Sequence, residues 1–178
     1  WDSKDMELNS GSIDCIWNGF TMNGREEDYT WSKPYVDNSQ VIVVPESSDV
    51  TDLSGLAGKI VGVQAASAAL ELLSEGGDQA DLAATFGSLQ QFPDYNNAFV
   101  ELQAGSIDAV AMDIGVAQYQ LKQKEGYKIL DEKLNSEKYA IGFKLGNEEL
   151  RDTVDDAMDQ LVADGTFAKL AEKYELTD

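Results

Sequence analysis

Three stretches of the sequence carry side chains that could bind small charged groups. The first, NGFTMNGREEDYTWSKPY over 18–35, brings Gly19, Thr21 and Arg25 close together in the chain. Glycine lets a backbone approach a ligand, threonine offers a hydroxyl, and the planar arginine fork suits a carboxylate. The alternative, which residue types alone favour, is that Arg25 pairs locally with one of the three acidic residues that follow it.

The second and third stretches each follow a predicted strand. GVQAASAAL over 62–70 delivers Gln64 and small residues to a helix that begins near Ser67, and N–H groups at a helix start attract anions. An ordinary strand-to-helix turn would have the same pattern. Asp113 ends another predicted strand, where its carboxylate could hold an ammonium group or cap the helix that follows.

Taken together, these residue types match the charged groups of an α-amino acid. An arginine fork and helix N–H groups suit its carboxylate, and a carboxylate suits its ammonium group. If two lobes each supply part of such a site, the ligand would close them. The sequence therefore predicts a binding site for a small zwitterion.

The scarce residue types exclude several classes of function. The chain of 178 residues has no histidine and one cysteine, Cys15, within the apolar run IDCIW. Ser-His-Asp and Cys-His catalysis and the usual zinc hydrolase site are therefore unavailable, and a lone cysteine forms no disulfide framework. We expect no metal site and no cofactor. The net charge of −20 argues against nucleic acid and anionic lipid as partners.

A repeated unit organises the chain. LNSGSIDCIWNG over 8–19 and LQAGSIDAVAMD over 102–113 each end a predicted helix at a glycine and lead through Ser-Ile-Asp into a short apolar strand. A glycine after a helix suits a left-handed cap, and a short apolar run suits a buried parallel strand. Two copies predict two similar α/β lobes, with ligand contacts beyond the strand ends. Those strand ends are Asn18-Gly19 and Met112-Asp113.

The remaining patterns complete this scheme. Further strands are predicted over 40–44, 59–64 and 138–143, and helices over 94–104 and 114–124. Two amphipathic helices are predicted from about 147 to 173, and the apolar stripe of the first is expected to pack in the core. The members of the stripe are Leu150, Val154, Met158, Leu161 and Val162. No apolar run approaches the roughly 20 residues that a membrane helix needs.

Three segments, in order, resemble the polar amino-acid-binding proteins of ABC importers, which form family 3 of the extracellular solute-binding proteins. DCIWNGFTMNGREEDYTWSKPYV resembles the family's apolar strand, Gly-x-Thr, and an arginine before a YTWS-like stretch. KIVGVQAASAALELL resembles its second-lobe turn. KYAIGFKLGNEELRDTVDDAMDQLVADGTFAKLAEKY resembles its C-terminal segment, including the D-G-T that begins the last helix. The resemblance covers essentially the whole chain.

The resemblance implies a fold and a division into domains. The implied fold is α/β, of the periplasmic-binding-protein-like type II class, with two α/β lobes joined by two crossing hinge strands near 36–44 and 137–143. Lobe 1 would comprise 1–39 and 137–178, and lobe 2 would comprise 40–136. The family begins with a β-α-β segment that this sequence lacks, so we expect lobe 1 to be incomplete. The segment would be truncated, or supplied by a second chain or a swapped segment.

The resemblance also implies how the α-groups of the ligand are bound. Arg25 would fork onto the carboxylate, which Ser67 and the amide of Ala68 would bind from the other lobe. Asp113 would hold the ammonium group, as would the carbonyl of Gly19. Thr21 would contact the ammonium group or the carboxylate.

Other positions are implied to face the ligand side chain or to line the site. Trp1 lies where the family places an aromatic that stacks on the ligand, and Gln64 and Met112 are the candidates for specificity. Asn18, beside Gly19, completes the predicted site. Two departures from the family pattern stand out. Gly24, where a glutamate is usual, precedes Arg25 after a loop shorter by one residue, and Ala66 replaces the usual glycine before Ser67.

The predicted function is to bind a free L-amino acid, with a polar or uncharged side chain favoured, and to deliver it to an ABC-type membrane permease. Such a protein is extracytoplasmic, either in the periplasm or as a surface lipoprotein of a Gram-positive bacterium. A ligand-sensing ectodomain of a receptor is the main alternative. A dehydratase-type enzyme on the same fold is less favoured, because an Asp113 paired with an ammonium group would make a poor general acid or base.

Overall fold

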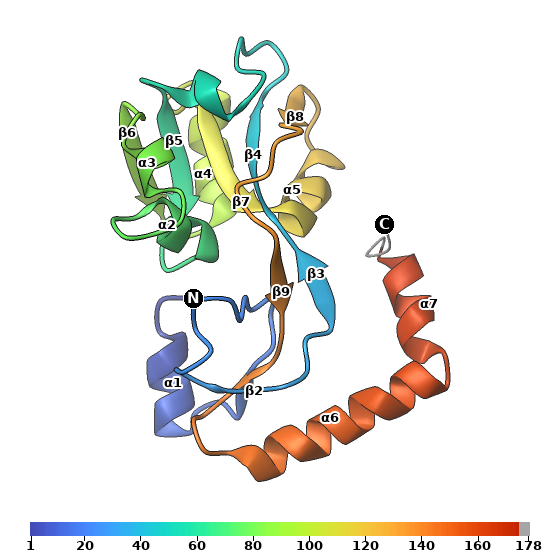
Figure 1. Cartoon of the computed structure of the whole chain (residues 1–178). Coiled ribbons are helices and arrows are strands. Elements are labelled where there is room, and N and C mark those ends of the chain that lie inside the picture. The colour runs from blue at the N-terminus through green and yellow to red at the C-terminus, as the bar shows by residue number, and fades with distance from the viewer. Residues whose placement is uncertain (175–178) are drawn as a thin grey trace. The chain divides into compact units, whose positions relative to one another are not determined.

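The computed structural model describes residues 1–174, which form two compact units (Figure 1). Unit 1 comprises Trp1–Asp2 and Asn38–Ser136, and unit 2 comprises Ser3–Asp37 and Glu137–Asp178. The last four residues of the range predicted for lobe 1, 175–178, lie outside the described residues.

The boundaries of the units differ from the predicted lobes at two places, and hydrogen bonds explain both. Trp1 belongs to unit 1, because its indole Nε1 donates to the carbonyl of Ala66 at 3.0 Å. Asn38 also belongs to unit 1, because its side-chain amide donates to Asp113 at 2.8 Å. Long-range contacts of this kind have no counterpart in the local sequence pattern.

Unit 1 is built on a five-stranded sheet in the order β6-β5-β7-β4-β8. The strands are β4 (Gln40–Pro45), β5 (Ile60–Gln64), β6 (Ser88–Phe92), β7 (Ala109–Asp113) and β8 (Tyr127–Ile129). β5 pairs in parallel with β6 and β7, whereas β4 pairs antiparallel with β7 and β8. The inner strands are runs of small and branched apolar residues, as expected where both faces are covered.

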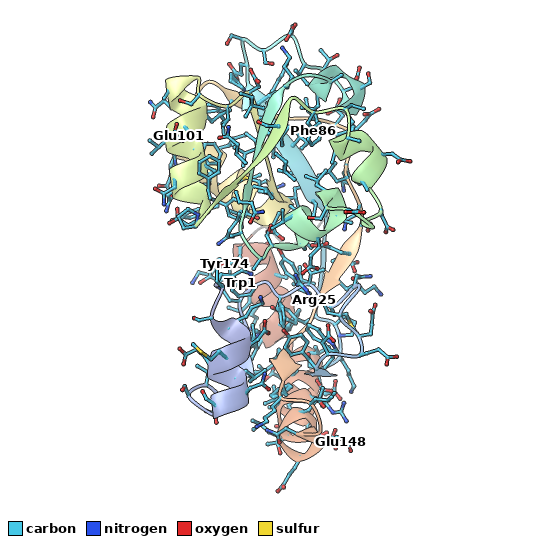
Figure 2. All side chains as sticks on the ribbon, turned by 90° about the vertical axis from the view of Figure 1, so that its left-hand side faces the viewer. Trp1, Arg25, Phe86, Glu101, Glu148 and Tyr174 are labelled. Atoms are coloured by element: carbon cyan, nitrogen blue, oxygen red, sulfur yellow. The ribbon has the colours of Figure 1, made fainter. Side chains whose placement is uncertain are left out.

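Helices cover both faces of this sheet (Figure 1). They are the 3₁₀ helix η1 (Leu53–Leu56), α2 (Ala68–Leu73), α3 (Ala80–Ala83), α4 (Tyr95–Ala104) and α5 (Ile114–Leu121). Alternate strand residues point to opposite faces, so Ile42 packs with α2 in one core cluster and Val41 packs with α4 in the other. In Figure 2, Glu101 on α4 and Phe86, after α3, lie on opposite sides of the unit.

Over its described residues, unit 2 contains small sheets and three helices. The elements are α1 (Lys4–Ser10), β1 (Cys15–Ile16), β2 (Thr30–Trp31), β3 (Val36–Asn38), β9 (Glu137–Tyr139), β10 (Gly142–Phe143), α6 (Glu148–Ala163) and α7 (Thr166–Lys173). β10 lies between β1 and β2, and β3 pairs with β9. Phe20, Tyr29 and Trp31 form an aromatic core with ring centroids 4.8 to 5.2 Å apart.

The predicted repeat is present in both units, with one difference in pairing. Gly11 after α1 and Gly105 after α4 both adopt the left-handed conformation at the helix end. The following strands, β1 and β7, begin where the repeat predicts. The expected parallel pairing holds for β7 with β5, but β1 pairs antiparallel with β10. The sequence pattern does not encode which strand becomes the neighbour.

The apolar stripe of α6 is not buried in the described chain, contrary to the prediction. Leu150, Val154 and Met158 are half-buried, and Leu161 and Val162 are exposed. Within unit 2, α6 packs on β2 and α7 (Figure 1), and these described neighbours leave the stripe incompletely covered. Among residues 1–174, no helix has the length and apolarity needed to cross a membrane.

A glycine in the sheet of unit 1 provides a test of its packing. A Cβ at Gly62 would lie 2.6 Å from the Cδ1 of Ile107 and 3.0 Å from the Cε2 of Phe92. We expect Gly62→Ala to lower the free energy of unfolding by about 1–3 kcal/mol through overpacking, as measured by chemical denaturation. Gly115→Ala is the control, because nothing lies within 4 Å of a Cβ there. It should raise stability by up to about 1 kcal/mol because alanine favours the helix. Equal stability of the two variants would contradict this packing.

Candidate functional site

In unit 2, the loop from Gly19 to Arg25 runs along β9. The amide of Ala140 donates to the carbonyl of Phe20 at 3.1 Å, and the amide of Met22 donates to the carbonyl of Lys138 at 3.0 Å. These backbone bonds give the loop a fixed register against a strand that lies more than a hundred residues later in the sequence.

Gly19 occupies a position that only glycine fits without strain. Its φ is +59°, and a Cβ would lie 3.2 Å from the ring of Tyr139. The hydroxyl of Tyr35 is hydrogen-bonded by the Trp17 side chain and the Gly19 backbone. Burial raises the pKa of Tyr35, and these two hydrogen bonds oppose the rise. Tyr35 is therefore neutral at physiological pH, and its hydroxyl is bonded to the backbone of Gly19 in the predicted ligand-contacting loop.

Gly24 stands directly before Arg25, where the family usually has a glutamate, and the backbone there explains the glycine. The amide of Arg25 donates to the carbonyl of Met22 at 3.0 Å, which closes a tight turn, and Gly24 has a φ of +80° within that turn. Such a turn needs a residue with positive φ at its third position, and glycine supplies it at no steric cost. The shorter loop is thus a closed turn that leads directly into Arg25.

Arg25 is a buried residue of unit 2. Its side chain is 7% exposed and Nη1 donates to the carbonyl of Thr21 at 3.2 Å (Figure 2 labels Arg25). The guanidinium carbon lies 5.2 Å from the ring centroid of Phe20. The three acidic residues that follow are exposed. Arg25 is therefore a buried side chain, although the residues that follow it in the loop are exposed.

A buried carboxylate beside this loop was not singled out by the sequence analysis. Glu137, the first residue of β9, is 2% exposed, and Oγ1 of Thr21 donates to its Oε1 at 2.7 Å. A buried carboxylate is costly unless it accepts hydrogen bonds. An acidic residue directly before a predicted apolar strand was the available sequence signal.

In unit 1, Ser67 caps α2 as the sequence predicted for a helix start. Its Oγ accepts from the amide of Leu70 at 3.1 Å, and its side chain is buried. The amides at the start of any α-helix, here beginning with Ala68, have no acceptor inside the helix. Ala66, before the cap, has a φ of +53°, and its carbonyl accepts from Trp1. A glycine, the usual residue at this position in the family, adopts such a positive φ without strain.

Asp113 accepts hydrogen bonds from neutral side chains, and its own side chain does not cap the helix that follows. Oδ1 accepts from the side-chain amides of Asn38 and Gln40, each at 2.8 Å, and Oδ2 accepts from the hydroxyl of Tyr95 at 3.3 Å. Asp113 precedes α5, but its side chain makes no capping hydrogen bond. The alternative of a simple helix cap is therefore wrong.

The two predicted specificity residues lie in different surroundings: Met112 is in the core and Gln64 is half-buried. Met112 has no exposed surface and belongs to the core cluster of α4 and α5. Since alternate residues of β7 face opposite sides, Met112 points to the core, so it offers no surface to a ligand. Gln64 is half-buried, and its side-chain amide donates to the carbonyl of Pro93 at 3.4 Å.

The predicted site residues thus fall into two groups, one in each unit. Unit 1 carries Trp1, Gln64, Ser67, Ala68, Met112 and Asp113, and unit 2 carries Asn18, Gly19, Thr21 and Arg25. The first group contains a preorganised carboxylate, and the second contains a buried guanidinium. Within residues 1–174, no cluster of three or more cysteine, aspartate or glutamate side chains is placed to hold a metal ion.

The chain has the fold of the type II periplasmic amino-acid-binding proteins. An ancestral arginine-binding protein bound to glutamine is 33% identical, with a TM-score of 0.87, over 98% of this chain and 76% of that one. The substrate-binding protein of an ABC uptake transporter from Streptococcus pneumoniae, with bound histidine, is 29% identical, with a TM-score of 0.91, over 98% of this chain and 72% of that one. The fold class predicted from the sequence is confirmed.

The chain belongs to family 3 of the bacterial extracellular solute-binding proteins, whose model matches residues 1–177. It is 26% identical to the L-cystine-binding protein TcyJ of Escherichia coli over 98% of this chain. It is 28% identical to the histidine-binding periplasmic protein of Salmonella typhimurium over 97% of this chain. It spans 64% of the length of the first relative and 68% of the second. The family and these relatives are binding proteins rather than enzymes, as the sequence analysis predicted.

The positive φ of Ala66 can be tested through stability. Left-handed backbone costs a non-glycine residue about 1 kcal/mol or more, and the extra freedom of glycine in the unfolded chain offsets part of that. We expect Ala66→Gly to raise the free energy of unfolding by up to about 1 kcal/mol. Ala65→Gly, at the neighbouring residue without positive φ, should lower it by about 0.5–1 kcal/mol. A loss of stability of the same size in both variants would contradict the conformation described for Ala66.

Proposed function

We propose that this protein binds a free L-amino acid at an extracytoplasmic location and delivers it to an ABC-type membrane permease. The observation that carries the proposal is the pair of opposite charges on separate units. Unit 2 holds the guanidinium of Arg25 in a buried setting, and unit 1 holds the carboxylate of Asp113 with three donors. These are the complements of the carboxylate and the ammonium group of one amino acid.

Arg25 is suited to the ligand carboxylate by geometry and by its surroundings. A guanidinium offers five N–H donors in a fixed fork, which matches a carboxylate through two parallel hydrogen bonds. The bond from Nη1 to the Thr21 carbonyl and the contact with the Phe20 ring restrict its orientation. A side chain that is already ordered loses less conformational entropy when the ligand binds.

Asp113 is suited to the ligand ammonium group for a similar reason. The side chains of Asn38, Gln40 and Tyr95 donate to it, and these neutral donors orient the carboxylate. In unit 1 the cap of α2 supplies a second element, because Ser67 and the amide of Ala68 offer polar groups to a carboxylate. We propose that one amino acid takes its contacts from both groups of residues.

We further propose that the ligand has a polar or uncharged side chain. Support comes from Gln64, which is half-buried and can both donate and accept hydrogen bonds. The named relatives bind different amino acids. One is named for L-cystine and another for histidine, and one solved neighbour holds glutamine. Trp1 is proposed to stack on the ligand from unit 1, with its indole nitrogen held by the Ala66 carbonyl.

We also propose that a further segment of polypeptide, or a second chain, completes unit 2. The apolar side chains of Leu161 and Val162 on α6 and Leu170 on α7 are exposed in the described chain. Exposed apolar residues gathered on amphipathic helices are typical of a surface that packs against another element.

A thermal-shift screen of the twenty common amino acids tests the function directly. A ligand that binds only the folded state stabilises it by mass action, by about 2.7 kcal/mol at a concentration 100 times its Kd. We expect one or a few amino acids to raise the melting temperature of the full-length protein strongly, with polar or uncharged side chains among the best. No response to any of them would contradict the proposed function, and turnover of an added ligand would contradict a pure binding role.

Substitutions at the two charged residues test the site. We expect Arg25→Ala and Asp113→Ala each to weaken binding of the best ligand by at least about 2 kcal/mol, the scale for unpairing a buried charged partner. Isothermal titration calorimetry measures the change. Arg151→Ala is the matched control, because that arginine lies on α6 and pairs with Asp152. It removes the same charge and should leave the affinity unchanged. Wild-type affinity in both site variants would show that the ligand binds elsewhere.

A further inference from the structure

The buried pair of Thr21 and Glu137 carries an inference that rests on the proposed function and adds to it. Thr21 is 4% exposed and Glu137 is 2% exposed, and the hydroxyl oxygen of Thr21 lies 2.7 Å from Oε1 of Glu137. At that distance an O–H donor makes a strong hydrogen bond to a carboxylate. The two residues lie 116 positions apart in the sequence.

The direction of this hydrogen bond determines what Thr21 can offer to a ligand. A threonine hydroxyl has one hydrogen to donate and two lone pairs that accept. Thr21 donates its hydrogen to Glu137. Its oxygen then accepts from a ligand but has no hydrogen left for a ligand carboxylate. Of the two roles that sequence resemblance leaves open for Thr21, contact with an ammonium group is the one that its hydroxyl can fill in this arrangement.

We propose that Glu137 is a positioning residue that fixes Thr21 as a hydrogen-bond acceptor for the ammonium group of the bound amino acid. Glu137 itself acts through Thr21. The same threonine receives Nη1 of Arg25 on its backbone carbonyl at 3.2 Å. Thr21 is therefore oriented from both sides, with its carbonyl toward the arginine and its hydroxyl hydrogen toward the glutamate.

The backbone keeps Thr21 and Glu137 together independently of their side chains. Thr21 forms an antiparallel bridge with Tyr139, and the amide of Met22 donates to the carbonyl of Lys138 at 3.0 Å. The amide of Lys138 in turn donates to Oδ1 of Asn23 at 2.8 Å. Conservative substitutions at positions 21 and 137 therefore change the hydrogen bond while the loop keeps its path.

A double-mutant cycle on the full-length protein tests the proposal, with the strongest stabiliser from the amino-acid screen as ligand. Glu137→Gln keeps the shape of the side chain but adds an N–H₂ donor that can take the lone pairs of Thr21. Thr21→Val removes the acceptor. We expect each variant to weaken binding about tenfold, the scale of one hydrogen bond to a charged group. The double variant should bind no more weakly than Thr21→Val, because the effect of Glu137 passes through the hydroxyl.

A des-amino analogue of the same ligand, with hydrogen in place of the ammonium group, separates positioning from a structural role. Thr21→Val should leave the affinity for the analogue unchanged while it lowers the affinity for the amino acid. This comparison stands even if Glu137→Gln fails to fold. Thr153→Val and Glu148→Gln, on the exposed face of α6, are the matched controls.

Several results would overturn the proposal. They are wild-type affinity in Glu137→Gln, additive losses in the double variant, and an equal loss for amino acid and analogue in Thr21→Val. If Arg25→Ala and Asp113→Ala weaken binding while Glu137→Gln does not, the proposed function stands and this inference alone fails. If the wild-type protein binds no amino acid, both fail.

Discussion

Burying the guanidinium of Arg25 is the constraint on which the candidate site in unit 2 depends. A charged group that leaves water must find hydrogen bonds and favourable electrostatic contacts, or folding becomes costly. Here the carbonyl of Thr21 and the ring of Phe20 provide such contacts, and Phe20 itself is packed into an aromatic core with Tyr29 and Trp31. The backbone of Arg25 is also tied to this aromatic core, because its carbonyl accepts a hydrogen bond from Nε1 of Trp31 at 3.0 Å.

Unit 1 meets the corresponding constraint for Asp113 through its sheet. Gln40 on β4 lies directly opposite Asp113 on β7 in the antiparallel register, so a cross-strand neighbour delivers one donor. Asn38, two residues earlier and on the same side of the extended chain, delivers the second. Tyr95, at the start of α4, delivers the third. A carboxylate at a strand end is thereby fixed before any ligand arrives, which reduces the entropic cost of binding.

The parts of this arrangement that sequence could predict are those with local causes. Gly11 and Gly105 predicted the helix ends of the repeat, and Ser67 predicted the start of α2, because capping geometry depends on neighbouring residues. Family resemblance supplied the fold class. Residue types and positions after predicted strands had already singled out Arg25 and Asp113 as site residues. The resemblance added their individual binding roles, which remain proposals.

The parts that sequence did not predict depend on contacts between distant segments or on which face of an element is covered. Glu137 meets Thr21 through a strand register that no local pattern encodes. Met112 was expected at the ligand. It packs in the core instead, because successive side chains of a strand point to opposite faces of the sheet and Met112 and Asp113 are neighbours. The stripe of α6 correctly predicted a helix, yet its burial depends on neighbours that periodicity alone does not specify.

The central claim is that two opposite charges, one from each unit, hold the charged head of an amino acid. A crystal structure of the protein with the amino acid that stabilises it most tests this claim directly. The account predicts the ligand carboxylate within about 3 Å of a guanidinium nitrogen of Arg25, and the ammonium nitrogen within about 3 Å of a carboxylate oxygen of Asp113. A bound amino acid whose charged groups contact neither side chain would contradict it.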